Sequence, residues 1–435
     1  MLALLLIAAC SSPDGRLLVE PATGPMSGYY RIHVQTDRPV DEVVLGGIRG
    51  FDVLPDGDGI SFSTHGHPDP GPVELLLGVD GVFHRHPKAF EFEAATPGLE
   101  HLVSVGASIA QGVQGGVPTH HGQLHSPSRF IAMQAGSWHP IPLVVDELFP
   151  ELKGSDVSAA PDCKVPSVED HLIQAAIDVL GKLNDVERNQ IGFYLGLVDP
   201  DVPPYNLAVG NSGVSTILHG PDEDDFAQLF LSKLVFDLYG DIADPVPGSQ
   251  LELALSYDPD IIVCADTYGN DLLGGASLDK VHDDLVELVA RFGESGAQVF
   301  LSNIPRPTLL PGSGTDEEED LLSVEYIEAL DTEAAKYDNV HVVDLSTAVE
   351  EAYADGLQVG DRVLLLEEYG GLLSTDGLHL SDVGYAYEAN LFIDRINSVM
   401  GTDLERIDLA EVYDSDRHSP DALLEQGIDP NCLPY

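Results

Sequence analysis

Residues 102–112 read Leu-Val-Ser-Val-Gly-Ala-Ser-Ile-Ala-Gln-Gly, which is the pattern of a strand, a turn and the start of a helix. The first four residues form a short apolar run with two valines, which is typical of a buried strand. A turn flanked by glycines then leads into a helical pattern. Similar apolar runs follow, and helical stretches separate them. The strands are expected at 206–209, 261–264, 299–301 and 340–343, and two of the helices at 278–292 and 323–337. This alternation predicts an α/β fold with a parallel sheet covered by helices on both faces.

A different pattern occupies residues 16–97, where short strands alternate with turns and helical periodicity is absent. Strands are expected at 29–34 and 73–79, with turns at 55–59 and 67–71. Short strands with frequent turns predict a small all-β sandwich. The residues Val19 to Pro25 and Val44 to Gly47 resemble those of an immunoglobulin-like IPT/TIG-type module.

These patterns divide the chain into four parts. We expect a signal and tether at 1–15, the β-sandwich at 16–97, an α/β domain at 98–400, and a polar, weakly patterned tail at 401–435. Within the α/β domain, the segment near 150–203 interrupts the strand–helix alternation and carries its own helical pattern. We interpret this segment as an insertion that overhangs a site.

The charge of the chain is strongly one-sided. It has 435 residues, with 20 Lys and Arg against 73 Asp and Glu, which gives a formal net charge of −53. Such a chain has no basic surface for nucleic-acid phosphates, so nucleic acid is excluded as a partner. The acidic run at 316–320 follows a Pro- and Gly-containing stretch, and we interpret it as an exposed loop rather than a metal site.

The N-terminus is an apolar run that ends in small residues and Cys10. This pattern resembles a bacterial lipoprotein signal, in which Cys10 is the lipidated residue, although the positive segment of a secretory signal is missing. The run is too short to span a bilayer. The resemblance implies an exported protein, either held at the cell envelope by a lipid anchor or secreted. A lipid anchor is the one membrane attachment that we expect.

Three cysteines remain beyond Cys10. Cys264 lies in the apolar run 261–265 and is expected to be a buried free thiol. Cys163 and Cys432 lie in Pro-containing, loop-like stretches. In an oxidising compartment they can form a disulfide, and the alternative is that both stay unpaired.

Polar residues follow the predicted strands at the points where each one ends. Ser108 follows the first strand, residues 210–213 (Gly-Asn-Ser-Gly) the second, and Asn270 the third. Ligands bind at the carboxyl ends of strands in such sheets. Further along the chain, Asp376 precedes His379 by three residues, a spacing that lets a carboxylate orient an imidazole. Each residue also has an ordinary explanation, such as a helix cap for Ser108 or Asn270.

The order of these residues resembles the GDSL/SGNH hydrolase family, over residues 100–400 approximately. The run 376–385 resembles the fifth conserved block of that family, and 302–305 resembles an element of its bacterial members. The resemblance implies a three-layer α/β/α doubly wound, flavodoxin-like sheet. It also implies a catalytic triad of Ser108, His379 and Asp376, with an oxyanion hole formed by the Ser108 N–H, a second-block N–H and the Asn270 amide.

Two positions depart from the family pattern. Ala107 stands where the family has an aspartate before the nucleophile, so the packing and hydrogen bonding of that aspartate are lost or replaced. The second-block donor is ambiguous. Gly213 fits if one residue is inserted, Gly210 fits without an insertion, and Asn211 is a third alternative because a backbone donor does not require glycine.

A histidine-rich stretch follows the predicted nucleophile turn. His121 and His125 would share a helix face and could bind a metal. Gly122 between them favours a loop, and no carboxylate stands at a fixed spacing from them. We therefore expect neither a metal nor another cofactor, and we expect these histidines to line the site entrance.

The predicted activity is hydrolysis of a carboxylic ester by a serine esterase or lipase, acting on a small-molecule or lipid ester. One alternative is a surface binding or adhesion lipoprotein on an inert hydrolase fold, which the sandwich and Ala107 motivate. The other is a carbohydrate acetyl esterase of the same fold. The sequence does not indicate the acyl length, the leaving group or the oligomeric state.

Overall fold

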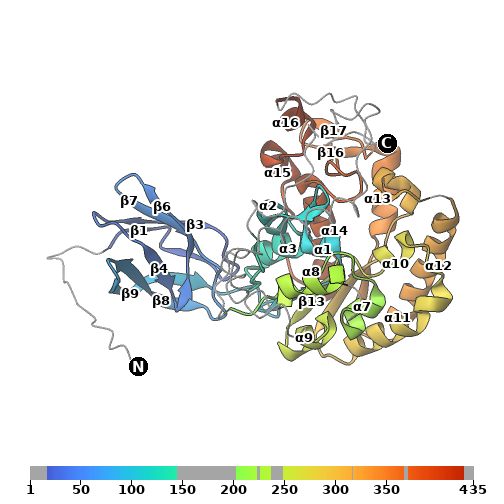
Figure 1. Cartoon of the computed structure of the whole chain (residues 1–435), viewed down its shortest axis with the longest axis horizontal. Coiled ribbons are helices and arrows are strands. Elements are labelled where there is room, and N and C mark those ends of the chain that lie inside the picture. The colour runs from blue at the N-terminus through green and yellow to red at the C-terminus, as the bar shows by residue number, and fades with distance from the viewer. Residues whose placement is uncertain are drawn as a thin grey trace.

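The computed structural model describes residues 17–144, 202–222, 226–236, 248–315, 317–366 and 371–425. The chain forms a β-rich N-terminal part and a larger α/β part (Figure 1). Cys10, Cys163, Cys432 and most of the expected insertion lie outside the described residues, and the predictions made for them stay predictions. Among the described residues, no helix is long and apolar enough to cross a membrane.

Two sheets form the N-terminal part. One has the order β1 (Val19–Glu20), β3 (Arg31–Gln35), β7 (Gly59–Ser63), β6 (Phe51–Asp56). The other has the order β2 (Thr23–Pro25), β9 (Val82–Glu93), β8 (Gly71–Val79), β4 (Glu42–Leu45), β5 (Ile48–Arg49). Inward residues of both sheets share one core, which includes Ile32, Phe62, Leu75 and Phe90. Their alternation with exposed residues explains why this region reads as short half-buried strands.

A parallel sheet forms the centre of the α/β part. Its order is β10 (Leu102–Val105), β13 (Ile261–Cys264), β14 (Gln298–Ser302), β15 (Val340–Val343). All three pairings are parallel, with Val105 opposite Cys264. Every residue of β10 and β13 is buried, which is why both strands read as continuous apolar runs. The prediction of a mixed α/β protein with a parallel sheet is confirmed.

The strand expected at 206–209 is only partly formed. This segment lies parallel to β10 through a single bridge between Ser104 and Asn206. The Ser104 N–H donates to the Tyr205 carbonyl, and the Leu207 N–H donates to the Ser104 carbonyl. The Val209 N–H also donates to the Gly106 carbonyl at 3.1 Å, but the Gly106 N–H donates to the Gln250 side chain at 2.8 Å instead of continuing the ladder.

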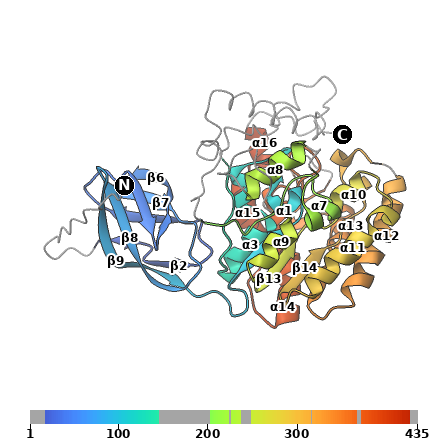
Figure 2. The ribbon, with the colours of Figure 1, turned by 60° about the horizontal axis from the view of Figure 1, so that its bottom comes forward.

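Helices cover both faces of the sheet (Figure 2). On one face, α3 (Pro127–Ala135) and α14 (Asp382–Met400) share a core with Leu102, Ile261 and Phe300. The other face is covered by α7 (Val214–His219), α9 (Gln250–Ser256), α11 (Leu278–Gly293) and α12 (Glu317–Ala334). Alternate strand residues, such as Val103 and Ile262, pack against this second set.

The prediction of an exposed loop at 316–320 is wrong for Glu317 to Asp320, which form the first turn of α12. Acidic side chains are favourable there because the N-terminal end of a helix carries a partial positive charge. A run of carboxylates therefore starts this helix rather than preventing it.

Shorter elements complete the described chain. They are α1 (Ser108–Gln111), β11 (Val113–Gln114), β12 (Val117–Pro118), α2 (His120–Leu124), α8 (Phe226–Phe236), α10 (Gly269–Leu273), α13 (Leu345–Asp355), β16 (Leu357–Val359), β17 (Arg362–Leu364), α15 (Leu409–Ser415) and α16 (Pro420–Glu425), with 3-10 turns at Pro307–Leu309 and Pro311–Ser313.

Candidate active site

Asp376 and His379 form a buried hydrogen-bonded pair within one turn. The Oδ2 atom of Asp376 lies 2.7 Å from Nδ1 of His379. The Oδ1 atom accepts hydrogen bonds from the N–H groups of Leu378 and His379, both at 2.9 Å, and from the Ser374 hydroxyl at 3.1 Å. Because Nδ1 donates its proton in a hydrogen bond to the carboxylate, the Nε2 lone pair of His379 is the one that can act as a base.

The surroundings of Asp376 keep this carboxylate ionised. Burial by itself would raise the pKa of Asp376, but the charge of His379 and the hydrogen bonds from His379 and Leu378 lower it to about 2. At neutral pH the pair therefore holds a fixed negative charge behind the imidazole.

Ser108 is the first helical residue of α1, directly after β10. Ala107 occupies the N-cap position, so the alternative that Ser108 caps this helix does not hold. Ser108 itself is half-buried. Gly106 before it has a φ of +130°, and an added Cβ would lie 2.9 Å from Ala110 and 3.1 Å from the Asp266 carbonyl. The strand-to-helix turn therefore requires glycine here.

Side-chain hydrogen bonds connect the turns after β10, after residue 209 and after β13. Gln250 accepts from the Gly106 N–H at 2.8 Å and donates to the Ser212 hydroxyl at 3.0 Å. The Asn270 amide donates to the Ser212 carbonyl at 3.0 Å. The three turns that carry the predicted nucleophile and oxyanion donors are thus held together at one end of the sheet.

The second turn distinguishes between the alternative backbone donors. The Gly210 N–H donates to Gln111 at 3.0 Å, so this N–H is already committed. Within the described part of the chain, the Asn211 and Gly213 N–H groups donate to no backbone carbonyl. Asn211 has a φ of +63°, and Gly213 precedes α7 as its N-cap residue. The geometry favours one of these two as the second donor.

The segment after α1 holds the Asp376–His379 turn. The Gly115 N–H donates to the Ser374 hydroxyl at 3.2 Å, and that hydroxyl donates in turn to Asp376. The Tyr385 hydroxyl donates to the Val113 carbonyl at 2.5 Å. On another side, the Gly312 N–H donates to the Gly377 carbonyl at 2.9 Å. The segment that follows the predicted nucleophile is therefore in direct contact with the turn that carries the predicted base, although no hydrogen bond joins Ser108 to His379 among the described residues.

Asp266 is a further acidic residue of the site, and the sequence analysis missed it. It follows β13 and is almost fully buried, and its Oδ1 atom accepts from the Gly269 N–H at 3.2 Å. Burial raises its pKa to about 6, although the Gly269 and Ile109 N–H groups and the charge of His379 lower it. An aspartate directly after an apolar strand, as in Ala265-Asp266, was the available sequence pattern.

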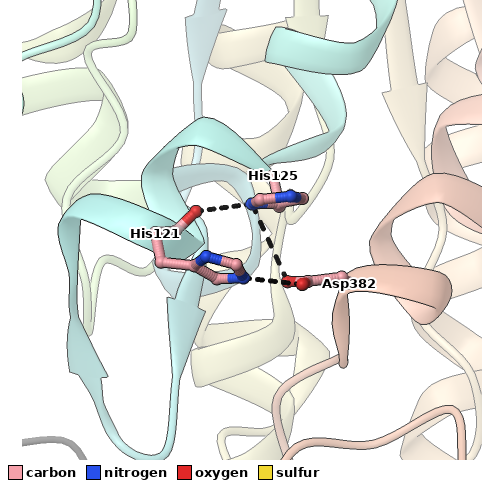
Figure 3. A group of neighbouring side chains, drawn as sticks. All are labelled: His121, His125 and Asp382. Atoms are coloured by element: carbon pink, nitrogen blue, oxygen red, sulfur yellow. Dashed lines mark hydrogen bonds and ion pairs between the residues drawn. The ribbon is translucent and has the colours of Figure 1, made fainter. Parts of the chain in front are cut away.

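A second polar cluster lies next to this site and contains His121, His125 and Asp382 (Figure 3). The interpretation of this histidine stretch as a loop is wrong, because α2 begins at His120 and includes Gly122. Thr119 stabilises the helix start by accepting the Gly122 N–H at 3.0 Å. Asp382, the carboxylate that joins the histidines, lies far along the chain.

Comparisons of the chain with models of known protein families and with curated proteins gave no match. The chemistry of the site is therefore argued from its own geometry.

Proposed function

We propose that this protein is a serine hydrolase that cleaves carboxylic esters. The observation that carries the proposal is the buried 2.7 Å hydrogen bond between Asp376 Oδ2 and His379 Nδ1. It lies in a turn that is hydrogen-bonded to the segment directly after Ser108. A nucleophile, a base and a carboxylate that orients the base are the parts that acyl transfer requires.

The arrangement of the sheet supports the proposal. With segment 206–209 beside β10, the strands follow the order 2-1-3-4-5, which is the flavodoxin-like order. Ser108, Asn270 and the 210–213 turn all follow strands of this sheet at their carboxyl ends, where ligands bind in such folds. This order agrees with the resemblance to GDSL/SGNH hydrolases, and the two packed N-terminal sheets agree with an immunoglobulin-like IPT/TIG-type module.

In the proposed mechanism, the Ser108 oxygen attacks the ester carbonyl carbon while Nε2 of His379 takes the hydroxyl proton. Asp376 keeps the imidazole oriented and stabilises its positive charge. His379 then gives the proton to the departing alcohol oxygen as the tetrahedral intermediate collapses. A water molecule repeats the sequence on the acyl-enzyme and releases the carboxylic acid.

The oxyanion of the intermediate is stabilised by the Ser108 N–H, by the Asn211 or Gly213 N–H, and by the Asn270 side chain. The Asn270 amide nitrogen has two hydrogens, and one of them is used on the Ser212 carbonyl. That bond fixes the amide so that its second hydrogen can be directed at the oxyanion. Removing one such donor typically costs about 3 kcal/mol of transition-state stabilisation.

The substrate is proposed to be a small-molecule or lipid ester, encountered outside the cell by a protein that is lipid-anchored through Cys10 or secreted. A carbohydrate acetyl ester is the alternative within the same chemistry. A panel of acetylated xylan and short- and long-chain acyl esters distinguishes these classes by their relative kcat/KM.

The decisive experiment replaces the nucleophile. Ser108→Ala should abolish hydrolysis of a short aryl ester and labelling by a fluorophosphonate probe, while the circular dichroism spectrum stays unchanged. The matched control is Ser215→Ala, which removes an exposed hydroxyl from the first turn of α7 and should leave both signals intact. If the probe does not label the wild type and the wild type hydrolyses no ester of the panel, the inert binding protein is the better hypothesis.

A further inference from the structure

The cluster of His121, His125 and Asp382 is compact and consists of two imidazoles and one carboxylate. Each residue offers one ligand atom, and the three atoms lie within 4.8 Å of one another. The Nε2 atom of His121 is 2.6 Å from Oδ2 of Asp382, and Nδ1 of His125 is 3.9 Å from Oδ1 of the same carboxylate. Figure 3 shows both imidazoles against the single carboxylate.

Local structure fixes both imidazoles. His121 lies within α2 and His125 is its C-cap residue, so the four-residue spacing places the two side chains on the same side of this turn. Their rings stack with centroids 4.1 Å apart and an interplanar angle of 25°. Nδ1 of His125 also lies 2.7 Å from the His121 carbonyl. This bond occupies Nδ1 and leaves Nε2 of His125 as the nitrogen that can bind a metal, while the carbonyl holds the ring in place.

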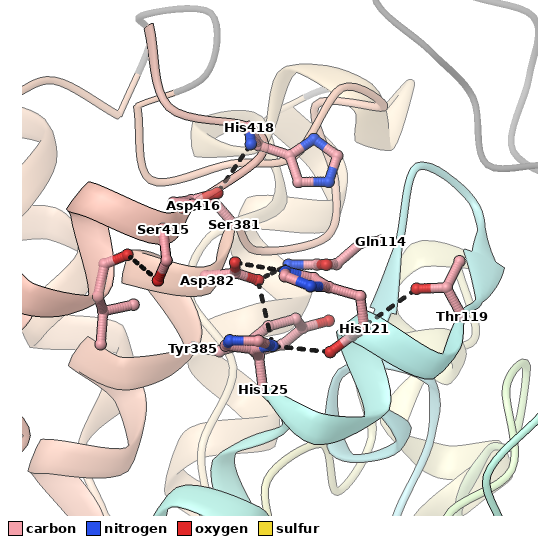
Figure 4. A network of polar contacts seen from close by, with 12 residues as sticks. Gln114, Thr119, His121, His125, Ser381, Asp382, Tyr385, Ser415, Asp416 and His418 are labelled. Atoms are coloured by element: carbon pink, nitrogen blue, oxygen red, sulfur yellow. Dashed lines mark hydrogen bonds and ion pairs between the residues drawn. The ribbon is translucent and has the colours of Figure 1, made fainter. Parts of the chain in front are cut away.

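The carboxylate is buried and supported from behind. The Asp382 side chain is fully buried, and the Gln114 amide donates to its Oδ1 atom at 2.8 Å. Asp416 adds a second buried carboxylate beside it, which accepts the N–H groups of Val383 and His418 (Figure 4). The positive charge of Arg417 also acts on His125 and disfavours a further positive charge there, whereas the two carboxylates favour one. Two neighbouring buried carboxylates favour the entry of a cation.

The donor set selects the class of cation. Two imidazole nitrogens and one carboxylate oxygen suit zinc and neighbouring transition metals, whereas calcium and magnesium prefer oxygen ligands alone. A tetrahedral ion with bonds of about 2.0–2.1 Å needs a separation of roughly 3.3 Å between two ligand atoms. The His121–Asp382 separation is 2.6 Å, so the two ligand atoms must move apart by about 0.7 Å to admit the ion.

We propose that His121, His125 and Asp382 bind one divalent transition-metal ion of the zinc class, with water completing the coordination. The ion would connect α2 to the first residue of α14, which lies three residues after His379. Its role is to hold these two segments together, and the site is independent of the proposed ester hydrolysis.

The test uses the full-length protein after removal of metals with a chelator. Zn²⁺ is titrated by calorimetry, the bound metal is counted by mass spectrometry after gel filtration, and Co²⁺ is added to record its visible absorption. We expect one Zn²⁺ per chain, a tetrahedral Co²⁺ spectrum, and a higher melting temperature with metal than without.

His121→Gln and His125→Gln should each weaken Zn²⁺ binding at least 100-fold and remove the Co²⁺ spectrum. The matched control is His219→Gln, which changes an exposed histidine paired with Asp284 and should bind as the wild type does. Each single His variant keeps the Asp382–Gln114 contact, and unchanged circular dichroism shows that it is folded. The proposal is overturned if the wild type does not bind Zn²⁺, or if the wild type and the three variants bind it equally. The cluster is then a metal-free hydrogen-bonded group.

Discussion

Two buried aspartates near His379 have opposite pKa shifts. Hydrogen bonds and the adjacent imidazole lower the pKa of Asp376 to about 2, against the effect of burial. For Asp266, burial dominates and raises the pKa to about 6. Environments that separate the pKa values of neighbouring acids are characteristic of catalytic sites. Asp376 therefore provides the permanent charge behind the imidazole, and Asp266 provides a charge that depends on pH.

The raised pKa of Asp266 predicts a pH-dependent stability difference. A carboxyl whose pKa is higher in the folded state binds more protons there, so stability falls as pH rises from about 4 to 6. Asp266→Asn removes this loss of stability, because the amide does not titrate. Its oxygen still accepts a hydrogen bond from the Gly269 N–H. At pH 7.5 the variant should be about 1–3 kcal/mol more stable than the wild type, with little difference at pH 4.

Urea unfolding at the two pH values measures this difference. The contributions of the other titrating groups to stability are the same in both proteins and cancel in the comparison. Asp338→Asn, at an exposed position between α12 and β15, is the control and should show no such pH dependence. An Asp266→Asn effect of equal size at both pH values would contradict the prediction.

In the turn before α7, position 213 has room for glycine but not for a larger residue. A Cβ on Gly213 would lie 2.6 Å from the Asp271 carboxylate, which accepts the Val214 N–H at 2.8 Å. Gly213→Ala should therefore displace Asp271 and the neighbouring Asn270. We expect a loss of about 1–3 kcal/mol in stability and a drop in ester hydrolysis of at least tenfold.

Gly210→Ala is the matched control in the same turn. Its Cβ would lie 3.3 Å from the Gln111 Oε1 atom, a contact that a shift of a few tenths of an ångström relieves. The free energy of unfolding should change by less than about 1 kcal/mol, and kcat should stay close to that of the wild type. Equal effects of the two substitutions would show that the Asp271 contact does not position Asn270.

Strands with continuous apolar runs were predicted well from the sequence, because burial on both faces selects the same residue types throughout. β10, β13, β14 and β15 all coincide with expected strands. The segment 206–209 is also mostly apolar, but the Gly106 N–H that would continue its ladder with β10 donates to the Gln250 side chain. Gly122 is a poor helix former, so the sequence predicts a loop at residues 120–124. In the structure these residues form α2, because the Thr119 cap outweighs that preference.

At the scale of the whole molecule, the sandwich and the α/β part meet in a buried contact. The Arg129 guanidinium of α3 donates to the Gly28 carbonyl at 2.8 Å and lies 5.0 Å from the centroid of the Tyr29 ring. The Tyr29 hydroxyl accepts the Ile141 N–H at 2.6 Å. Trp138 packs with the core of the sandwich although it follows α3 in the chain.

Tyr29→Phe leaves the Ile141 N–H without its acceptor in this contact. An unpaired buried donor costs about 1–3 kcal/mol, so the variant should lose that much stability. Urea unfolding followed by tryptophan fluorescence reports on it, because Trp138 is the single tryptophan of the chain. Tyr387→Phe removes a long 3.4 Å hydrogen bond and serves as the control with a smaller loss. Equal losses in both variants would mean that the Tyr29 hydroxyl does not stabilise the contact.

The alternation of strands and helices and the Asp376–His379 pair could both be predicted from the sequence alone. Both depend on neighbouring residues, since a three-residue spacing in one turn is enough to bring a carboxylate to an imidazole. Three contacts became clear only in the folded structure: Asp382 meets His121 and His125, Asp266 is buried beside the Gly106–Ser108 turn, and the Gly210 N–H donates to Gln111. These contacts depend on the order of the strands and the packing of the helices, which bring together residues far apart in the chain and which no local pattern encodes.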